Sequence, residues 1–291
     1  MKGQREFGQR MAGTSRASIG NWFEAALPRL AVGTTALTFA LVLLGVWTAV
    51  AGYGLTCDGR WPLCDGAVFG LFPANFGSFV EWFHRLVAMV TGFAILGSAA
   101  GTWIAGSSLR ARAAFTAALV LTPVQVVLGG LTVTRYEQLI LASHFGAAVV
   151  ILALLVVGTL LLLDRPVSAV LFGSVAAGSL FVAAALTPGV LVAVHSVGLH
   201  VGFVGLALAG FVALLGVAVS PGSRPIGLRA LAGTGALFVA VATTIGRVRL
   251  DPSGQILVLA GLSLALVLAV VIVASARRGS FDADRIGPAE F

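Results

Sequence analysis

Charged residues are scarce in this chain. Of its 291 residues, only 10% are charged while 58% are hydrophobic, and the mean hydropathy is +1.03. So few charged residues cannot form the water-exposed surface of a soluble domain. The composition therefore excludes a soluble protein and predicts one that crosses a membrane several times. The apolar runs also lack the alternation with polar residues that a membrane β-barrel requires, which excludes that class.

Eight apolar segments approach or exceed the about 20 residues that a spanning helix needs. We therefore predict an all-α polytopic membrane protein whose helices form two pseudo-repeated four-helix bundles. The predicted helices cover residues 31–51, 78–104, 113–131, 138–162, 167–187, 190–218, 230–246 and 255–275. The predicted regions are a basic N-terminal segment 1–30, a first half 31–163 with an external loop 52–77, a second half 164–276 and a tail 277–291.

Positive charge is rare on one side of these helices. Of the 18 Lys and Arg residues, 13 fall on one side, Arg85 lies within a helix, and the other side has Arg60, Arg135, Arg247 and Arg249. The positive-inside rule then places both chain ends in the cytoplasm of a cell-membrane protein. The net charge of +7 is spread over several loops, which favours contact with anionic lipid over nucleic-acid binding.

Cysteine is nearly absent, and both copies lie in the external stretch "GLTCDGRWPLCDG", residues 54–66. Two cysteines without a nearby histidine do not favour a metal site. Because the outer side of a cell membrane is oxidising, we predict a disulfide between Cys57 and Cys64. Such a bond either takes part in redox chemistry or closes a short loop.

Histidine is also rare, and all four copies fall in apolar segments, where ionisable side chains mark functional sites. His84 and His144 each lie about six residues inside helices that run in the same direction, so they share a depth of roughly 9 Å. Two imidazoles at one depth can face each other across a flat cofactor, and imidazole is a usual haem ligand. His195 and His200 lie in the sixth helix, and His195 can equally be a packing residue.

An internal repeat is only weakly visible. An offset of 116 residues maps His84 onto His200, but it maps His144 onto Ala260 and Glu81 onto Val197. If the halves are duplicates, the first kept the polar set and the second kept one histidine.

Four stretches resemble the haem A synthase family, the membrane enzymes that convert haem O to haem A. They are the cysteine loop, "EWFHR" (81–85), "QVVLGGLTV" with "LASHFGAAV" (125–133 and 141–149), and, more loosely, "VGLHVGFVGLALAG" (197–210). The resemblance implies that His84 and His144 flank the substrate haem O, and that His200 is an axial iron ligand of a haem b in the second half. The segment 255–271 lacks histidine, methionine and cysteine, so the expected second ligand of that haem b is missing. The second haem is then five-coordinate on His200, ligated by His195, or absent.

The conversion turns a ring methyl into a formyl group. Positive charge that develops at the methyl carbon would be stabilised by a carboxylate in a low dielectric. Glu81 lies three residues before His84 and shares its helix face, which favours a catalytic role. Glu81 can also simply pair with Arg85, and Arg85 can bind a haem propionate.

The implied partners are haem O, membrane lipid, a haem O synthase and the assembly of cytochrome oxidase. Two other functions stay open: a b-type cytochrome, which needs the histidine pair but not Glu81, and a haem-binding relative without catalysis. A transporter is disfavoured because no broken helices are evident.

Overall fold

The computed structural model is predominantly helical. It describes the backbone of residues 2–286 apart from residues 59, 61–63, 65–66, 69–71, 74, 136, 188–195, 223 and 249–250. Side chains are described within residues 25–278, less these stretches and the strand residues 67–68 and 72–73. His195, a predicted alternative haem ligand, lies outside the described residues.

The described part of the chain contains eight α-helices. They are α1 (Lys2–Val50), α2 (Phe76–Ile104), α3 (Leu109–Thr134), α4 (Gln138–Leu163), α5 (Ala169–Ala185), α6 (Val197–Val219), α7 (Ile226–Val248) and α8 (Pro252–Ile286). The external loop also carries a 3₁₀ turn, Tyr53–Leu55, and a two-stranded antiparallel ladder of β1 (Ala67–Val68) and β2 (Phe72–Pro73).

Seven of these helices are long and apolar enough to cross a membrane, within the residues that could be searched. The exception is α5, with 17 residues. At 1.5 Å per residue α5 spans about 26 Å, a little less than the roughly 30 Å of a hydrocarbon core. The prediction of a multi-pass, all-helical membrane protein is confirmed, whereas the pseudo-repeat between its halves stays a prediction.

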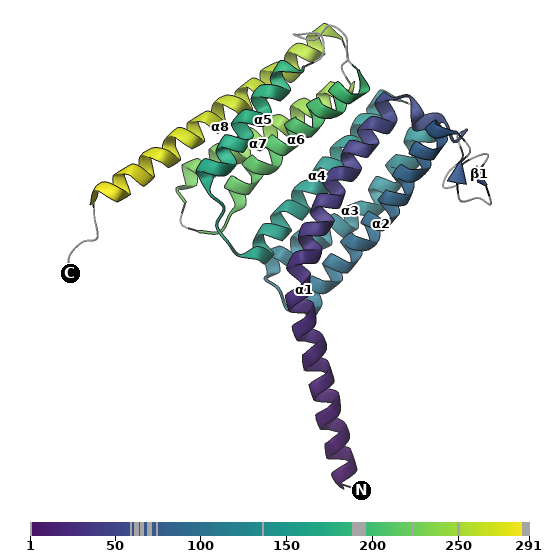
Figure 1. Ribbon diagram of the computed structural model, residues 1–291, viewed down its shortest axis with the longest axis vertical. Helices are drawn as coiled ribbons and strands as arrows, with labels where there is room; N and C mark the ends of the chain where they lie inside the picture. Colours follow the sequence, from purple (N-terminus) through teal and green to yellow (C-terminus); the bar gives the residue numbers. More distant parts are fainter. Residues whose placement is uncertain are drawn as a thin grey trace.

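The helices pack in two neighbouring groups, α1 to α4 and α5 to α8 (Figure 1). In the first group, α1 and α3 each pack against both α2 and α4, so α2 and α4 occupy opposite corners. Polar contacts join its helices: the Thr34 and Ser98 hydroxyls lie 3.0 Å apart, and those of Thr35 and Thr159 lie 2.9 Å apart. Such hydroxyl pairs hold helices together where the surrounding lipid provides no hydrophobic drive.

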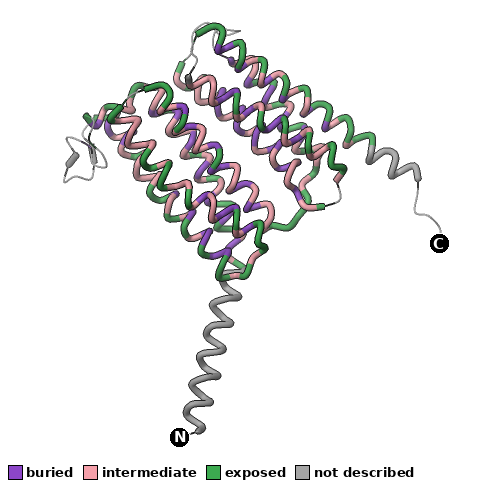
Figure 2. Tube along the Cα trace, turned by 180° about the vertical axis from the view of Figure 1, so that it is seen from behind, coloured by how far each residue is buried: buried purple, intermediate pink, exposed green. Residues whose placement is uncertain are grey.

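One hydrophobic core runs across the boundary between the groups. It joins Val42 of α1 and Phe145 and Val149 of α4 to residues of the second group such as Phe203 and Leu262. The buried positions follow the facing sides of neighbouring helices (Figure 2). The two halves are thus packed as a single body.

Candidate haem site

His84 and His144 come from the opposite corners of the first group. His84 is the ninth residue of α2 and His144 the seventh of α4, so they lie about 12 and 9 Å from the starts of their helices. The imidazoles are near enough to each other to interact electrostatically. These positions agree with the expected placement near the starts of two helices, and the shared depth stays a prediction.

Glycines on the other two helices make room for these rings. A Cβ atom at Gly45 of α1 would lie 2.9 Å from Cε1 of His84, and one at Gly129 of α3 would lie 3.2 Å from Cε1 of His144. Any larger residue would push the imidazoles out of place. Gly129 lies in the stretch 125–133 that carries the family resemblance, whereas nothing in the sequence pointed to Gly45.

Each imidazole has a nitrogen without a partner in the described structure. Nδ1 of His84 and Nδ1 of His144 are buried without a hydrogen bond, as is Oε1 of Gln125. The Nε2 atoms of Gln125 and His144 lie 3.4 Å apart, and the direction of this contact depends on the tautomer of the imidazole. Buried polar atoms normally have partners, so an unpaired ring nitrogen on each of two neighbouring imidazoles fits the ligation of a haem iron.

Glu81 is buried, with 3% of its surface exposed, and its hydrogen bonds point toward the external loop. Its Oε2 accepts a hydrogen bond of 2.8 Å from the backbone N–H of Cys57 and one of 3.2 Å from the Thr56 hydroxyl. Its Oε1 accepts from Nη2 of Arg85. The ion pair that the sequence offered as the simpler interpretation is therefore formed, and Glu81 also anchors the loop to α2.

Arg85 links the same loop to α2 from the outside. Besides Glu81, it donates a hydrogen bond of 2.8 Å through Nη1 to the backbone carbonyl of Arg60. Arg85 directly follows His84 on α2, and its role as a haem-propionate ligand stays a prediction.

The predicted disulfide between Cys57 and Cys64 is present, with a Cα–Cα distance of 4.5 Å. Both sulfurs lie 3.8 Å from the Ser78 carbonyl oxygen in the first turn of α2. The bond thus fixes the loop directly above the turn that carries Glu81.

The second half has no matching pair of ligands among its described residues. His200 is only the fourth residue of α6, because the helix begins at Val197 and not near residue 190 as predicted; Ser196 caps it by accepting from the Leu199 N–H. The His200 ring contacts Phe203 edge-on, with centroids 6.0 Å apart. Ala260, the counterpart of His144, is exposed. These residues fit a haem b on one side only, so no reaction step is assigned to that group.

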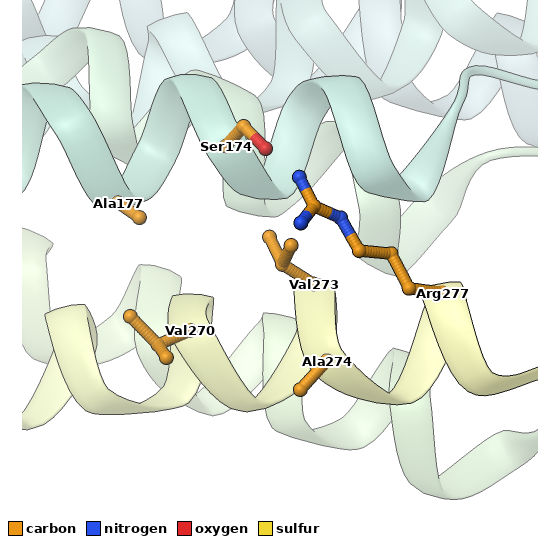
Figure 3. A pocket seen from close by; sticks show the side chains of 6 residues that line it. All are labelled: Ser174, Ala177, Val270, Val273, Ala274 and Arg277. Atoms are coloured by element: carbon orange, nitrogen blue, oxygen red, sulfur yellow. The ribbon is translucent and has the colours of Figure 1, made fainter.

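Beyond His84, His144 and His200, the described residues show no further candidate metal or haem site. No cluster of three or more His, Cys, Asp or Glu side chains occurs within them. A groove between α5 and α8 is lined by small and aliphatic side chains with Arg277 reaching into it (Figure 3). It carries no histidine and belongs to the second half.

Comparison with known proteins gives two kinds of relative. The chain is 31% identical over 142 residues to a "Heme A synthase" of Bacillus licheniformis, which covers 48% of this chain and 46% of that protein. It is 35% identical over 130 residues to a "Heme A synthase" of Alkalihalophilus pseudofirmus, 44% of this chain and 43% of that protein. It is also 40% identical over 110 residues to a "Protoheme IX farnesyltransferase" of Halobacterium salinarum, 38% of this chain but only 22% of that protein.

These matches span less than half the length of the relatives, and most of the farnesyltransferase lies outside its match. No family model matches the chain. No solved structure matches it either. The predicted resemblance to haem A synthases is nevertheless confirmed by several relatives of that name.

Proposed function

We propose that this chain is a membrane oxidoreductase that binds haem O between His84 and His144 and converts one ring methyl group to the formyl group of haem A. The observation that carries the proposal is the pair of half-buried imidazoles, each with a buried, unpaired Nδ1 and each packed against a glycine. The similarity to haem A synthases supports the choice of substrate. The similarity supports haem modification as the activity, and oxidation of the methyl group is the more specific proposal.

The net reaction balances with dioxygen as the oxidant class: R–CH₃ + O₂ gives R–CHO + H₂O. The protein's contribution is to bind, orient and stabilise charge. His84 of α2 and His144 of α4 would hold the haem through their ring nitrogens, and Gln125 contacts the His144 ring and would help to orient it. Interactions aimed at developing charge contribute more in a water-poor site than in water.

Glu81 supplies the negative charge in this proposal. It lies one helical turn from His84, and a buried carboxylate stabilises positive charge at a nearby methyl carbon more strongly than an exposed one. Arg85 holds Glu81 in place through an ion pair, because a planar guanidinium pairs well with a carboxylate. The external disulfide holds the Cys57 N–H that completes this arrangement.

The proposed setting is a cell membrane with both chain ends in the cytoplasm, so the haem site opens near the outer face. Haem O is the proposed substrate and membrane lipid the surrounding solvent. A haem O synthase and the assembly of cytochrome oxidase are the proposed partners; the match to protoheme IX farnesyltransferases supports a link to haem O formation. A haem b on His200 of the second half is proposed as a one-sided site only.

A second candidate function is a b-type cytochrome that only transfers electrons. One observation favours it: both oxygens of Glu81 are already occupied by Arg85, Cys57 and Thr56. A carboxylate with this many partners can be purely structural.

The deciding experiment is haem extraction from membranes that contain this chain together with a haem O synthase, followed by chromatography and mass spectrometry. A haem A peak that is absent from the empty-vector control is the expected result. Haem bound to the purified chain without any haem A, in cells that accumulate haem O, would instead assign the chain as a cytochrome or a non-catalytic relative.

A further inference from the structure

Arg247 of the second half packs against α4, the helix of the first half that carries His144. It lies in the last turn of α7, and its Cζ is 5.2 Å from the centroid of the Phe145 ring on α4. Phe145 directly follows His144, and the Arg247 charge is near enough to act on that imidazole. A guanidinium over a ring face is attracted by the negative face of the ring, so the contact holds the cation in place.

The packing around this contact is close. A Cβ atom at Gly146 of α4 would lie 3.4 Å from Cγ2 of Thr244 of α7, which is ordinary van der Waals contact. Arg247 and Thr244 lie three residues apart on α7 and therefore on one face. That face of α7 lies against the turn of α4 that carries His144, and Arg247 is half-buried there.

The two histidines thus have matching cations from different sources. On α2, His84 is followed by Arg85. On α4, the residue after His144 is Phe145, and the positive charge over that position comes from Arg247. Arg85 is the tenth residue of α2 and donates to the Arg60 carbonyl of the loop, whereas Arg247 lies in the last turn of α7.

We propose that Arg247, together with Arg85, binds the two carboxylate side chains of a tetrapyrrole held between His84 and His144. The inference rests on the proposed haem site and assigns an anion-binding residue of that site to the second half. A planar guanidinium suits carboxylates because it offers two parallel N–H donors. The site of the first half is then incomplete without α7.

The test compares two ligands that differ only in charge. Purified full-length chain in detergent is titrated with ferric protohaem and with its dimethyl ester, whose carboxylates are blocked, and binding is followed by Soret absorbance. Titration of the His84→Ala variant measures the haem binding that occurs outside the proposed site. Arg247→Gln should weaken binding of the diacid about tenfold and of the diester hardly at all, since a charged hydrogen bond is lost only in the first case.

Arg135→Gln is the matched control, because Arg135 is an exposed arginine at the end of α3 on the same outer side. It changes the net charge equally and should leave both affinities unchanged. Arg247→Lys keeps the positive charge but loses the two parallel N–H donors of the guanidinium. Its affinity for the diacid should therefore lie between those of wild type and Arg247→Gln.

Three results would overturn the inference. An equal loss for diacid and diester would make Arg247 a structural residue, and so would an equal effect of Arg135→Gln and Arg247→Gln on the diacid. No loss for Arg247→Gln would remove it from the site altogether. If wild type binds neither ligand more tightly than His84→Ala, the proposed haem site itself fails, which is a distinguishable outcome.

Discussion

The first four helices and the last four use their interiors differently. The interior of the first group contains ionisable and amide side chains, namely His84, His144 and Gln125, beside glycines. The second group contains large aliphatic side chains with almost no exposure, such as Leu180, Leu208, Leu214, Leu262 and Ile272. Unpaired polar atoms cost stability, whereas a packed aliphatic interior does not. Among the described residues, the unpaired buried side-chain atoms thus lie in the first group, where we propose the haem site.

Removing an imidazole should have the largest effect on haem binding, and the effect should differ between the two groups. We expect His84→Ala or His144→Ala to abolish the Soret band of haem bound in the first group, because one axial ligand is lost. His200→Ala should remove at most a minor fraction of bound haem, because the described residues of the second group include no second histidine. The measurement is haem per protein by pyridine hemochrome analysis; the reverse ranking would place the principal site in the second group.

Glu81 is a second difference between the two groups. The offset of 116 residues that relates His84 to His200 relates Glu81 to Val197, which carries no charge. We expect Glu81→Gln to retain haem binding and to reduce haem A formation about 100-fold, within the range of a lost electrostatic stabiliser. Product analysis by mass spectrometry and haem content are measured on the same membranes. Equal product from wild type and Glu81→Gln would leave Glu81 as an anchor for the loop.

Truncating the aliphatic interior should affect stability and not ligand binding. Leu262→Ala in the second group removes a fully buried side chain and should cost about 2–5 kcal/mol of unfolding free energy. Thermal denaturation in detergent would show this as a lower midpoint, while the affinity for haem at 25 °C should stay within about twofold. A large loss of affinity in this variant would mean that the second group also shapes the site through its core.

The smallest expected effect comes from one methyl group. Gly45→Ala places a Cβ against His84, and moving the ring should weaken haem binding by about tenfold, equivalent to roughly 1–2 kcal/mol of overpacking. Gly33→Ala on the same helix is the control, since nothing lies within 4 Å of its Cβ position. Absorbance titration of both variants measures the difference, and identical affinities would show that Gly45 is not shaped around the imidazole.

Much of this arrangement could be predicted from the sequence. The apolar runs predicted the helices, and the position of His84 and His144 within their runs predicted a shared depth, because helical rise is constant. The pairing of Cys57 with Cys64 followed from their isolation in one loop. Such inferences depend on spacing along a single segment.

Contacts between distant segments could not be predicted in this way. The start of α6 was placed too early because residues 190–196 are apolar enough to continue a helix, whereas Ser196 provides the cap that begins it. Gly45 and Arg247 lie far from the histidines in sequence, and only packing brings them to the site. Arg247 in particular looked like one of four arginines on the outer side.

The core that joins Val42 and Phe145 to α6 and α7 also bears on the order in which the protein is made. Translation delivers the N-terminal segments first, so α1 to α4 reach the membrane while the faces that will contact α6 and α7 still meet only lipid. The ribosome must pass residue 247 before the outer rim of the haem site gains its last cation. Under this proposal, the nascent chain becomes able to bind a tetrapyrrole with two carboxylates when the seventh helix is inserted.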